Sequence, residues 1–124
     1  MKAIVAKDAP QAIGPYSQGV DCGDFVFVSG QLPINPENGE IPEGIAAQTN
    51  QALKNADAIL KASGLSLENA CKVTVYLSDI SEFAEMNECY GKFFKEPCPA
   101  RAAIQAAALP KGAKIEIDVI ASKK

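Results

Sequence analysis

Near the end of the chain, apolar and acidic residues alternate one by one, and this stretch constrains the fold more than any other. Ile115, Ile117 and Val119 are separated by Glu116 and Asp118. Because successive side chains of a strand point to opposite faces, the pattern predicts a strand with one apolar and one polar face. Such a strand requires a sheet whose apolar face is covered by other elements.

The remaining segments alternate between strand-like and helix-like patterns. Strands are predicted at residues 24–30, 70–79, 100–108 and 113–122, helices at residues 45–63 and about 79–94, and a short strand or hairpin near the N-terminus. This β-α-β-α-β-β order predicts an α+β fold, in which a mixed β-sheet carries two helices on one face. Because no repeat, linker or low-complexity segment interrupts it, we expect a single domain over residues 1–124.

Each predicted helix has a polar and an apolar side. In the first helix, the side expected to face water carries Gln48, Gln51, Lys54, Asn55 and Lys61. In the second helix, the apolar stripe carries Phe83, Met86, Tyr90, Phe93 and Phe94. We expect this stripe to pack in the core. Asn87 lies at its border and is the one polar amide there.

The charge balance argues against two classes of partner. The chain has a formal net charge of -3 and its basic residues are scattered, so nucleic acid is a disfavoured partner. No apolar run approaches the roughly 20 residues that cross a membrane. The N-terminus also becomes polar too early for a secretory signal. We therefore expect a soluble, cytoplasmic protein.

The chain contains no histidine, which removes several kinds of catalysis. Ser-His-Asp and Cys-His sites are excluded, so acid-base chemistry must fall to Asp, Glu, Tyr, Lys or Cys. The four cysteines form no CxxC pair, and free thiols are expected rather than a metal site. No glycine-rich phosphate loop is present. We therefore expect neither a metal nor a nucleotide cofactor.

Arg101 is a charged residue in the alanine-rich strand that precedes the alternating one. If these two strands formed a tight hairpin, Arg101 would pair near Ser122, and Glu116 would lie on the order of 20 Å away. Two interpretations stay open: a solvent-facing polar side with a surface salt bridge, or a cleft in which Arg101 binds a carboxylate and Glu116 handles protons. In a simple hairpin, the second would require two subunits.

Two features predict that another chain covers the free face of the sheet. Alanine is a poor strand former, yet one predicted strand carries Ala102, Ala103, Ala106, Ala107 and Ala108. Small side chains suit a strand against which another backbone packs closely. Two helices also cover only one side of a sheet, so we expect a homo-oligomer.

Two further segments have ordinary explanations when taken alone. Tyr16 follows a Gly-Pro turn, where its ring can project from the fold, although most loop tyrosines serve packing. Ser29 and Gly30 end a predicted strand, which places a hydroxyl and a flexible backbone at a sheet edge. Neither segment identifies a site by itself.

Taken together, six segments change this interpretation: AIGPYSQ, FVFVSGQLP, GIAAQTNQALKN, VTVYLSDISEFAEMNECYGKFF, PARAAIQAAALP and IEIDVIA. They occur in this order, cover nearly the whole chain and strongly resemble the YjgF/YER057c family, also called the RidA family, of enamine/imine deaminases. Several separated motifs at compatible spacing make the resemblance specific.

The resemblance implies a fold like that of Bacillus chorismate mutase and a homotrimer with clefts between subunits. It also implies that the final strand inserts between earlier strands, so that Arg101 of one chain could meet Glu116 of its neighbour. By position, Arg101 matches the family's carboxylate-binding arginine and Glu116 its acid-base glutamate. The positions that line the family's pocket are occupied here by Tyr16, Ser29, Gly30 and Asn87.

The implied activity is hydrolysis of small enamine/imine acids, such as 2-aminoacrylate, 2-iminopropanoate and 2-iminobutanoate, to 2-keto acids and ammonia without a cofactor. One position departs from the pattern, because deaminase-type relatives often carry a cysteine where this chain has Ala103. We interpret Ala103 as tuning substrate preference. Two alternatives stay open: an endoribonuclease or translation inhibitor, and a non-enzymatic trimer that binds small carboxylates.

Overall fold

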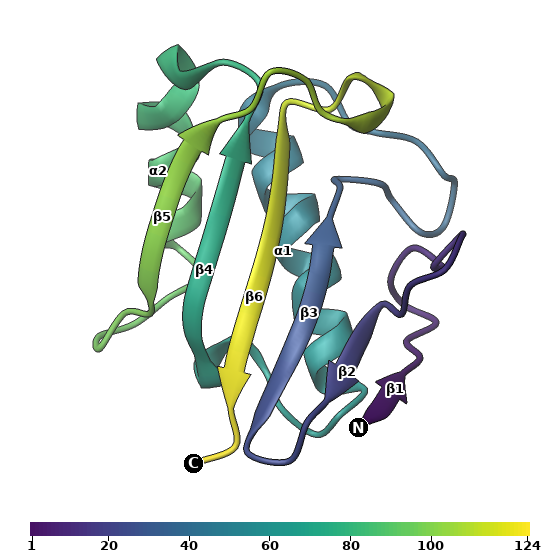
Figure 1. Cartoon of the computed structure of the whole chain (residues 1–124). Helices are drawn as coiled ribbons and strands as arrows, with labels where there is room; N and C mark the ends of the chain where they lie inside the picture. The colour runs from purple at the N-terminus through teal and green to yellow at the C-terminus, as the bar shows by residue number, and fades with distance from the viewer.

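A computed structural model describes all residues 1–124 and contains one six-stranded sheet with two α-helices (Figure 1). The elements in chain order are β1 (Lys2–Ile4), β2 (Gly19–Asp21), β3 (Phe25–Gln31), α1 (Ile45–Lys61), β4 (Ala70–Leu77), α2 (Phe83–Gly91), β5 (Ala100–Gln105) and β6 (Ile115–Ser122). The predicted α+β class and the predicted order of strands and helices are confirmed.

The last strand lies inside the sheet rather than at its edge. The strand order is β1-β2-β3-β6-β4-β5 (Figure 1). Only β4 and β5 pair in parallel, and the other neighbours are antiparallel. The sheet is therefore mixed, as predicted. Since β6 pairs with β3 and β4, the consecutive strands β5 and β6 do not form a hairpin.

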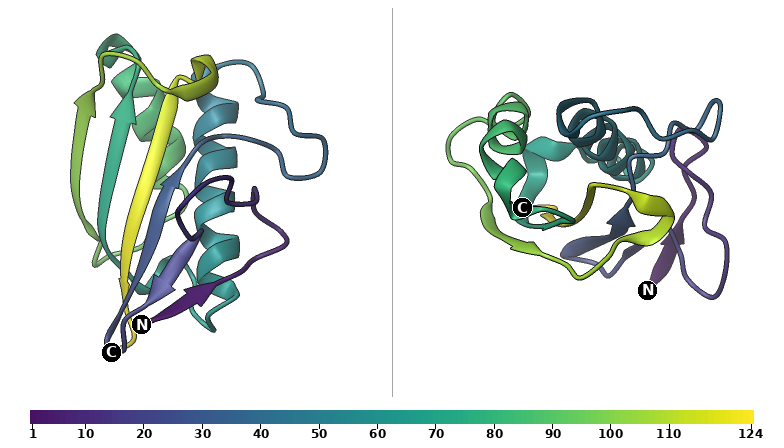
Figure 2. Two further views of the ribbon diagram at one scale, coloured as in Figure 1. Left: turned by 45° about the vertical axis from the view of Figure 1, so that its right-hand side comes forward. Right: turned by 90° about the horizontal axis from the view of Figure 1, so that it is seen from above.

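Both helices cover the same face of the sheet, as the two views in Figure 2 show. The alternation in β6 explains the core beneath them: Ile115, Ile117 and Val119 are buried, whereas Glu116 and Asp118 lie half-buried on the opposite face. The buried β6 side chains join those of β3, β4 and α1 in one apolar cluster. None of the helices is both long and apolar enough to span a bilayer.

The other face of the sheet carries no helix and exposes large apolar side chains. Phe25 and Phe27 on β3 are 44% and 42% exposed, and Ile104 on β5 is 50% exposed. Register places Ile104 level with Tyr76 of β4, which in turn pairs with Glu116 of β6. We call this side of the sheet the open face.

Two predicted elements are shorter in the structure. Helix α2 ends at Gly91, so Phe93 and Phe94 lie in the turn beyond it, although both still pack against the core. Asp79 caps a short 3-10 turn before α2 by accepting a bond of 2.9 Å from the Ser81 backbone N–H. Strand β5 ends at Gln105, so the last three of its five predicted alanines lie outside it.

The predicted polar side of α1 is wrong at two positions. Gln48 and Asn55 are only 5% and 0% exposed, because protein backbone rather than water satisfies their amides. The Asn55 Nδ2 donates to the carbonyls of Leu32 and Ile34 at 3.0 and 2.9 Å. These bonds fasten the irregular segment after β3 to the helix.

Gln48 makes a second attachment between α1 and its surroundings. Its Nε2 donates to the Pro42 carbonyl at 2.9 Å, and its Oε1 accepts from the backbone N–H of Lys114 at 2.8 Å. The residues that lead into β6 and the segment before α1 are thus bonded to one side chain. A buried amide serves here as a connector between segments that share no sheet hydrogen bonds.

Replacing Asn55 by alanine is expected to lower the free energy of unfolding by about 2–4 kcal/mol, since two buried carbonyls lose their donor. Gln51→Ala is the matched control, because the Gln51 amide bonds only to Asn55 Oδ1, at 2.9 Å. We expect this control to cost about 1 kcal/mol or less. Urea unfolding measures both values, and equal losses would contradict the proposed anchoring role.

Candidate functional site

The six predicted site residues fall into two groups that the structure keeps apart. Tyr16, Ser29, Gly30 and Glu116 lie around the bend at the end of β3, and we call them the Glu116 group. Asn87 and Arg101 contact one another between α2 and β5, and we call them the Arg101 group.

The strand that was predicted to end at Gly30 continues to Gln31, and Ser29 and Gly30 form an irregular step just before the end of β3. The regular pairing of β3 with β6 is interrupted between Val28 and Gln31. Ser29 is fixed at this step: its N–H donates to the Gln18 carbonyl at 2.9 Å, and its hydroxyl donates to the Ser17 carbonyl at 2.6 Å. The Ser29 oxygen therefore keeps its acceptor capacity while its proton is engaged.

Gly30 gives room to Glu116. A Cβ on residue 30 would overlap the Glu116 carboxylate, with Oε2, Cδ and Cγ as its nearest neighbours. Glycine leaves this space to the Glu116 side chain, which approaches the backbone closely. The irregular step in β3 thus provides space for the carboxyl group of Glu116 on the neighbouring strand β6.

Glu116 has the environment of a carboxyl group that resists ionisation. Partial burial raises its pKa above the ordinary value, and the nearby charge of Asp118 raises it further. The Asp118 carboxylate accepts a hydrogen bond of 3.1 Å from the Tyr76 hydroxyl. The four ion pairs of the chain use other acids, namely Asp57, Glu82, Asp21 and Asp24. Glu116 is thus free to exchange a proton with a ligand.

Tyr16 and Gly30 line a common pocket of about 340 Å³. Tyr16 projects as predicted and is 53% exposed. Lys111, in the turn before β6, contributes the only ionised side chain of the pocket wall. Its backbone is left-handed, with φ of 59°, which is uncommon for a residue other than glycine. Lys111 was not predicted as a site residue, and its only signal in the sequence is its place in a Pro-Lys-Gly segment.

Arg101 is the only arginine of the chain, and its guanidinium group lies against side chains of α2. Nη1 donates to Asn87 Oδ1 at 2.6 Å. The guanidinium carbon lies 4.7 Å from the ring centre of Tyr90 and 5.4 Å from that of Phe83. No carboxylate of the chain pairs with Arg101, so the predicted surface salt bridge is wrong. The cation is stacked and exposed, with N–H groups available to an anion.

The rings beneath Arg101 were predicted to be core residues. This is correct for Tyr90, which is buried, whereas Phe83 is half-buried. Their second role as a platform for the guanidinium was missed. It follows from the parallel pairing of β5 with β4, which brings Arg101 level with Val73 on the helix side of the sheet. No local pattern in the sequence indicates that pairing.

The two groups cannot meet within one chain. Glu116 pairs with Tyr76, which is level with Ile104 on β5. Arg101 precedes Ile104 by three positions and lies two strands away from β6, so the two Cα atoms are more than about 10 Å apart at ordinary strand spacings. Their side chains also leave opposite faces of the sheet. This separation follows from the strand order, since β5 and β6 do not form the hairpin considered for the sequence.

Ala103 shares the helix-side face of β5 with Arg101. It is half-buried, packs against the core cluster and lies level with Val75 of β4. The methyl group therefore fills part of the surface from which the Arg101 side chain leaves. A larger side chain at this position would contact the core as well as the arginine.

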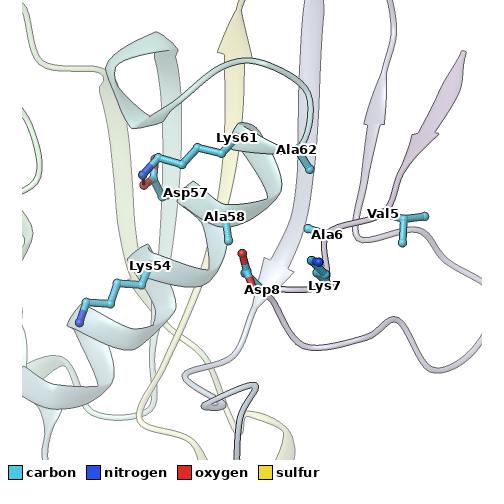
Figure 3. Close-up of a pocket in the computed structure, with 9 residues that line it drawn as sticks. All are labelled: Val5, Ala6, Lys7, Asp8, Lys54, Asp57, Ala58, Lys61 and Ala62. Carbon is cyan, nitrogen blue, oxygen red and sulfur yellow. Dashed lines mark ion pairs between the residues drawn. The ribbon is translucent and has the colours of Figure 1, made fainter.

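A larger pocket, of about 760 Å³, lies between residues 5–8 and α1 and contains none of the predicted site residues (Figure 3). Two acids, Asp8 and Asp57, line this pocket. Asp57 is engaged on both oxygens: Oδ2 pairs with Lys61 Nζ at 2.9 Å, and Oδ1 accepts from the Leu67 backbone N–H at 3.0 Å. Figure 3 shows Lys61 and Asp57 turned toward one another. We assign this pocket no part in the candidate site.

The fold and the site define a small α+β protein with a protonatable carboxyl group on its open face and a stacked arginine at the edge of its sheet. The family described as Endoribonuclease L-PSP matches residues 6–123. The chain belongs to this family, the YjgF/RidA family. The family resemblance noted in the sequence is therefore confirmed.

Two relatives and two solved structures illustrate the similarity. The 2-iminobutanoate/2-iminopropanoate deaminase of Escherichia coli strain K12 is 46% identical, covering 99% of this chain and 98% of that protein. A RutC family protein of Pyrococcus horikoshii is 50% identical, with the same coverage. The crystal structure of the E. coli YjgF gene product matches with a TM-score of 0.96, 46% identity and full coverage of both chains. The structure of E. coli TdcF with bound serine matches with a TM-score of 0.95, 46% identity and full coverage.

Glu116→Gln is expected to stabilise the protein at pH 8. The pKa of Glu116 is raised in the folded state, so its ionisation costs stability as the pH rises through that pKa, and glutamine removes the cost. The difference should vanish below the ordinary value of 4.5. Thermal unfolding at pH 4 and pH 8 measures it, with Glu88→Gln as an exposed control. A variant less stable than wild type at pH 8 would contradict the burial argument.

Gly30→Ala is expected to displace the Glu116 carboxylate while leaving the fold intact, because the far end of a flexible side chain can move away from the added methyl group. Glu116 would become more hydrated, and its pKa would fall toward the ordinary value. Carboxyl NMR titration measures this change. Gly91→Ala is the control, since its Cβ meets nothing within 4 Å. An unchanged Glu116 titration in Gly30→Ala would show that the contact does not control this carboxyl group.

Proposed function

We propose that the chain hydrolyses 2-imino acids, such as 2-iminopropanoate and 2-iminobutanoate, and their enamine tautomers to 2-keto acids and ammonia. One observation carries the proposal: Arg101 is an exposed cation without a carboxylate, and Glu116 is a half-buried carboxyl group without a cation. The deaminase relative, 46% identical along nearly its whole length, supports it. So does the bound serine described for TdcF, since serine carries a nitrogen beside a carboxylate.

Each residue has a role that its chemistry suits. The planar fork of Arg101 binds the substrate carboxylate through two N–H groups. Glu116 takes a proton from water as the water oxygen adds to the imine carbon, and returns a proton to the nitrogen. In the resulting carbinolamine, Glu116 carries a second proton from the new hydroxyl group to the nitrogen. The carbon–oxygen double bond forms as the carbon–nitrogen bond breaks, and a 2-keto acid and ammonia leave. Tyr16, Ser29, Asn87 and the backbone of Gly30 line the site and hold the water or the nitrogen.

This chemistry needs no redox partner or electron sink, because the imine carbon is already electrophilic. We therefore propose a cofactor-independent enzyme. The Ser29 hydroxyl donates its hydrogen bond to the Ser17 carbonyl, so its oxygen is left to accept a hydrogen bond at the site. The substitution of alanine at position 103 would alter the wall beside Arg101 and so tune the choice of substrate side chain.

We further propose that the enzyme is a homotrimer, with the chorismate mutase-like arrangement that the family resemblance implies. The exposed Phe25, Phe27 and Ile104 of the open face support an association of chains. The opposite placement of Arg101 and Glu116 supports sites shared between neighbours. Residues 1–124 would form one domain of a cytoplasmic assembly.

Arg101→Ala is expected to abolish hydrolysis of an imine that an amino-acid dehydratase generates in the assay, because the substrate loses its anchor. Ammonia and 2-keto acid release measure the reaction, and sedimentation checks that the variant assembles like wild type. Arg101→Lys keeps the charge but not the fork and should regain only part of the activity. Near-normal hydrolysis by Arg101→Ala would refute the assignment.

Mixing Arg101→Ala with Glu116→Gln subunits tests the shared site directly. Each variant alone should be inactive, but a mixed trimer can pair an intact arginine from one chain with an intact glutamate from another. Equal amounts refolded together should recover about a quarter of the wild-type activity if assembly is random. Mixed preparations as inactive as either variant alone would exclude sites shared between chains.

The same preparations separate this proposal from its two alternatives. The net charge of -3 gives little attraction for RNA, although the family is described as Endoribonuclease L-PSP. Cleavage of RNA by the wild type, lost in Glu116→Gln, would favour a ribonuclease. Carboxylate binding without imine hydrolysis would favour a non-enzymatic binding protein.

A further inference from the structure

Tyr90 has contacts that core packing alone does not explain. It lies on the inner side of α2 and is 6% exposed. One neighbour of its ring is Phe94, at a centre-to-centre distance of 4.6 Å and an angle of 35°. The other is the guanidinium group of Arg101, at 4.7 Å from the ring centre. A buried neutral ring therefore supports an exposed cation.

The ring, rather than the hydroxyl group, makes these contacts. The Tyr90 hydroxyl is buried and has no hydrogen-bond partner in the protein. Burial raises the pKa of this hydroxyl, while the charge of Arg101 opposes the rise, so the ring stays neutral near pH 7. Removing the hydroxyl alone would leave the stacked surface unchanged and relieve a buried unpaired group.

Helix spacing makes the support rigid. Phe83, Asn87 and Tyr90 stand at positions i, i+4 and i+7, so all three face the same side of α2. Asn87 Oδ1 fixes Nη1 of Arg101, and the two rings fix the plane of the guanidinium group. An unsupported arginine samples many rotamers, and ordering them on binding costs affinity.

We propose that Tyr90 is a positioning residue, whose ring holds the Arg101 guanidinium group in the orientation that binds a small carboxylate. The residue acts through Arg101 and does not contact the substrate. The inference rests on the proposed function only in taking Arg101 as the residue that binds the substrate carboxylate. Whether the ring positions Arg101 can be measured without any catalytic assay.

Because the chain has one arginine, its side-chain Nε–H gives a single NMR signal without assignment. In the wild type this signal should be shifted upfield by the aromatic rings. Tyr90→Phe keeps the ring and should keep the shift, whereas Tyr90→Leu should move the signal toward its position in a free arginine. An arginine signal that is the same in Tyr90→Leu and wild type would overturn the proposal.

Titration with 2-oxobutanoate, the keto acid of the proposed reaction, measures the consequence by calorimetry. Tyr90→Leu should weaken binding by about threefold to tenfold, and Tyr90→Phe should restore it. Phe94→Leu removes the neighbouring ring without removing either ring that contacts Arg101, and it should bind like wild type. Equal weakening in Phe94→Leu and Tyr90→Leu would reduce Tyr90 to a packing residue.

The Arg101→Ala variant separates the two levels of inference. If it binds 2-oxobutanoate as the wild type does, the proposed role of Arg101 fails, whatever the NMR signal shows. If it loses binding while Tyr90→Leu binds normally, the role of Arg101 stands and that of Tyr90 fails. In hydrolysis, Tyr90→Leu should raise KM and leave kcat nearly unchanged, a split that general loss of folded protein does not produce.

Discussion

The insertion of β6 between β3 and β4 is the constraint on which the rest of the structure depends. A strand in the centre of a sheet is hydrogen-bonded to a neighbour on each side. Its alternation of apolar and acidic residues therefore determines which side chains face the core and which face the open side at the middle of the sheet. Its apolar side chains become the middle of the core, and Glu116 comes to lie over the irregular step of β3. The same insertion leaves β5 at the edge, bonded only to β4. The position of β6 in the strand order thus places Glu116 on a central strand and Arg101 on the edge strand β5.

The two carboxyl groups of β6 lie on the same face but have different surroundings. The Asp118 carboxylate accepts a hydrogen bond from the Tyr76 hydroxyl, which compensates for part of its desolvation. Glu116 lies over the backbone of Gly30, has no such donor and feels the charge of Asp118. Neighbouring carboxyl groups whose environments differ in this way tend to take different roles. The hydrogen bond between Asp118 and Tyr76 joins β6 to β4, and the charge of Asp118 also makes the ionisation of Glu116 less favourable.

Periodicity was sufficient to predict the strands and helices, because each element must present an apolar side to a single core. It failed where a polar side chain binds the backbone: Asn55 and Gln48 were assigned to water, yet carbonyls and an N–H group of distant segments satisfy them. Periodicity also failed to predict the contact of Glu116 with Gly30 and the stacking of Arg101 on Phe83 and Tyr90. Both depend on the pairing of strands that lie far apart in the sequence. The candidate site residues came from the family resemblance and not from local motifs alone, and their division between two faces required the topology.

The open face and the divided site pose one physical problem. Exposure of the apolar side chains of Phe25, Phe27 and Ile104 to water is unfavourable, and association with another chain would bury them. A chain that carries its cation and its acid on opposite faces cannot apply both to one small substrate. Association of copies would answer both needs with a single interface. Under the proposed function, selection on catalysis and selection on assembly would therefore act on the same strands, and a substitution on the open face would change both properties together.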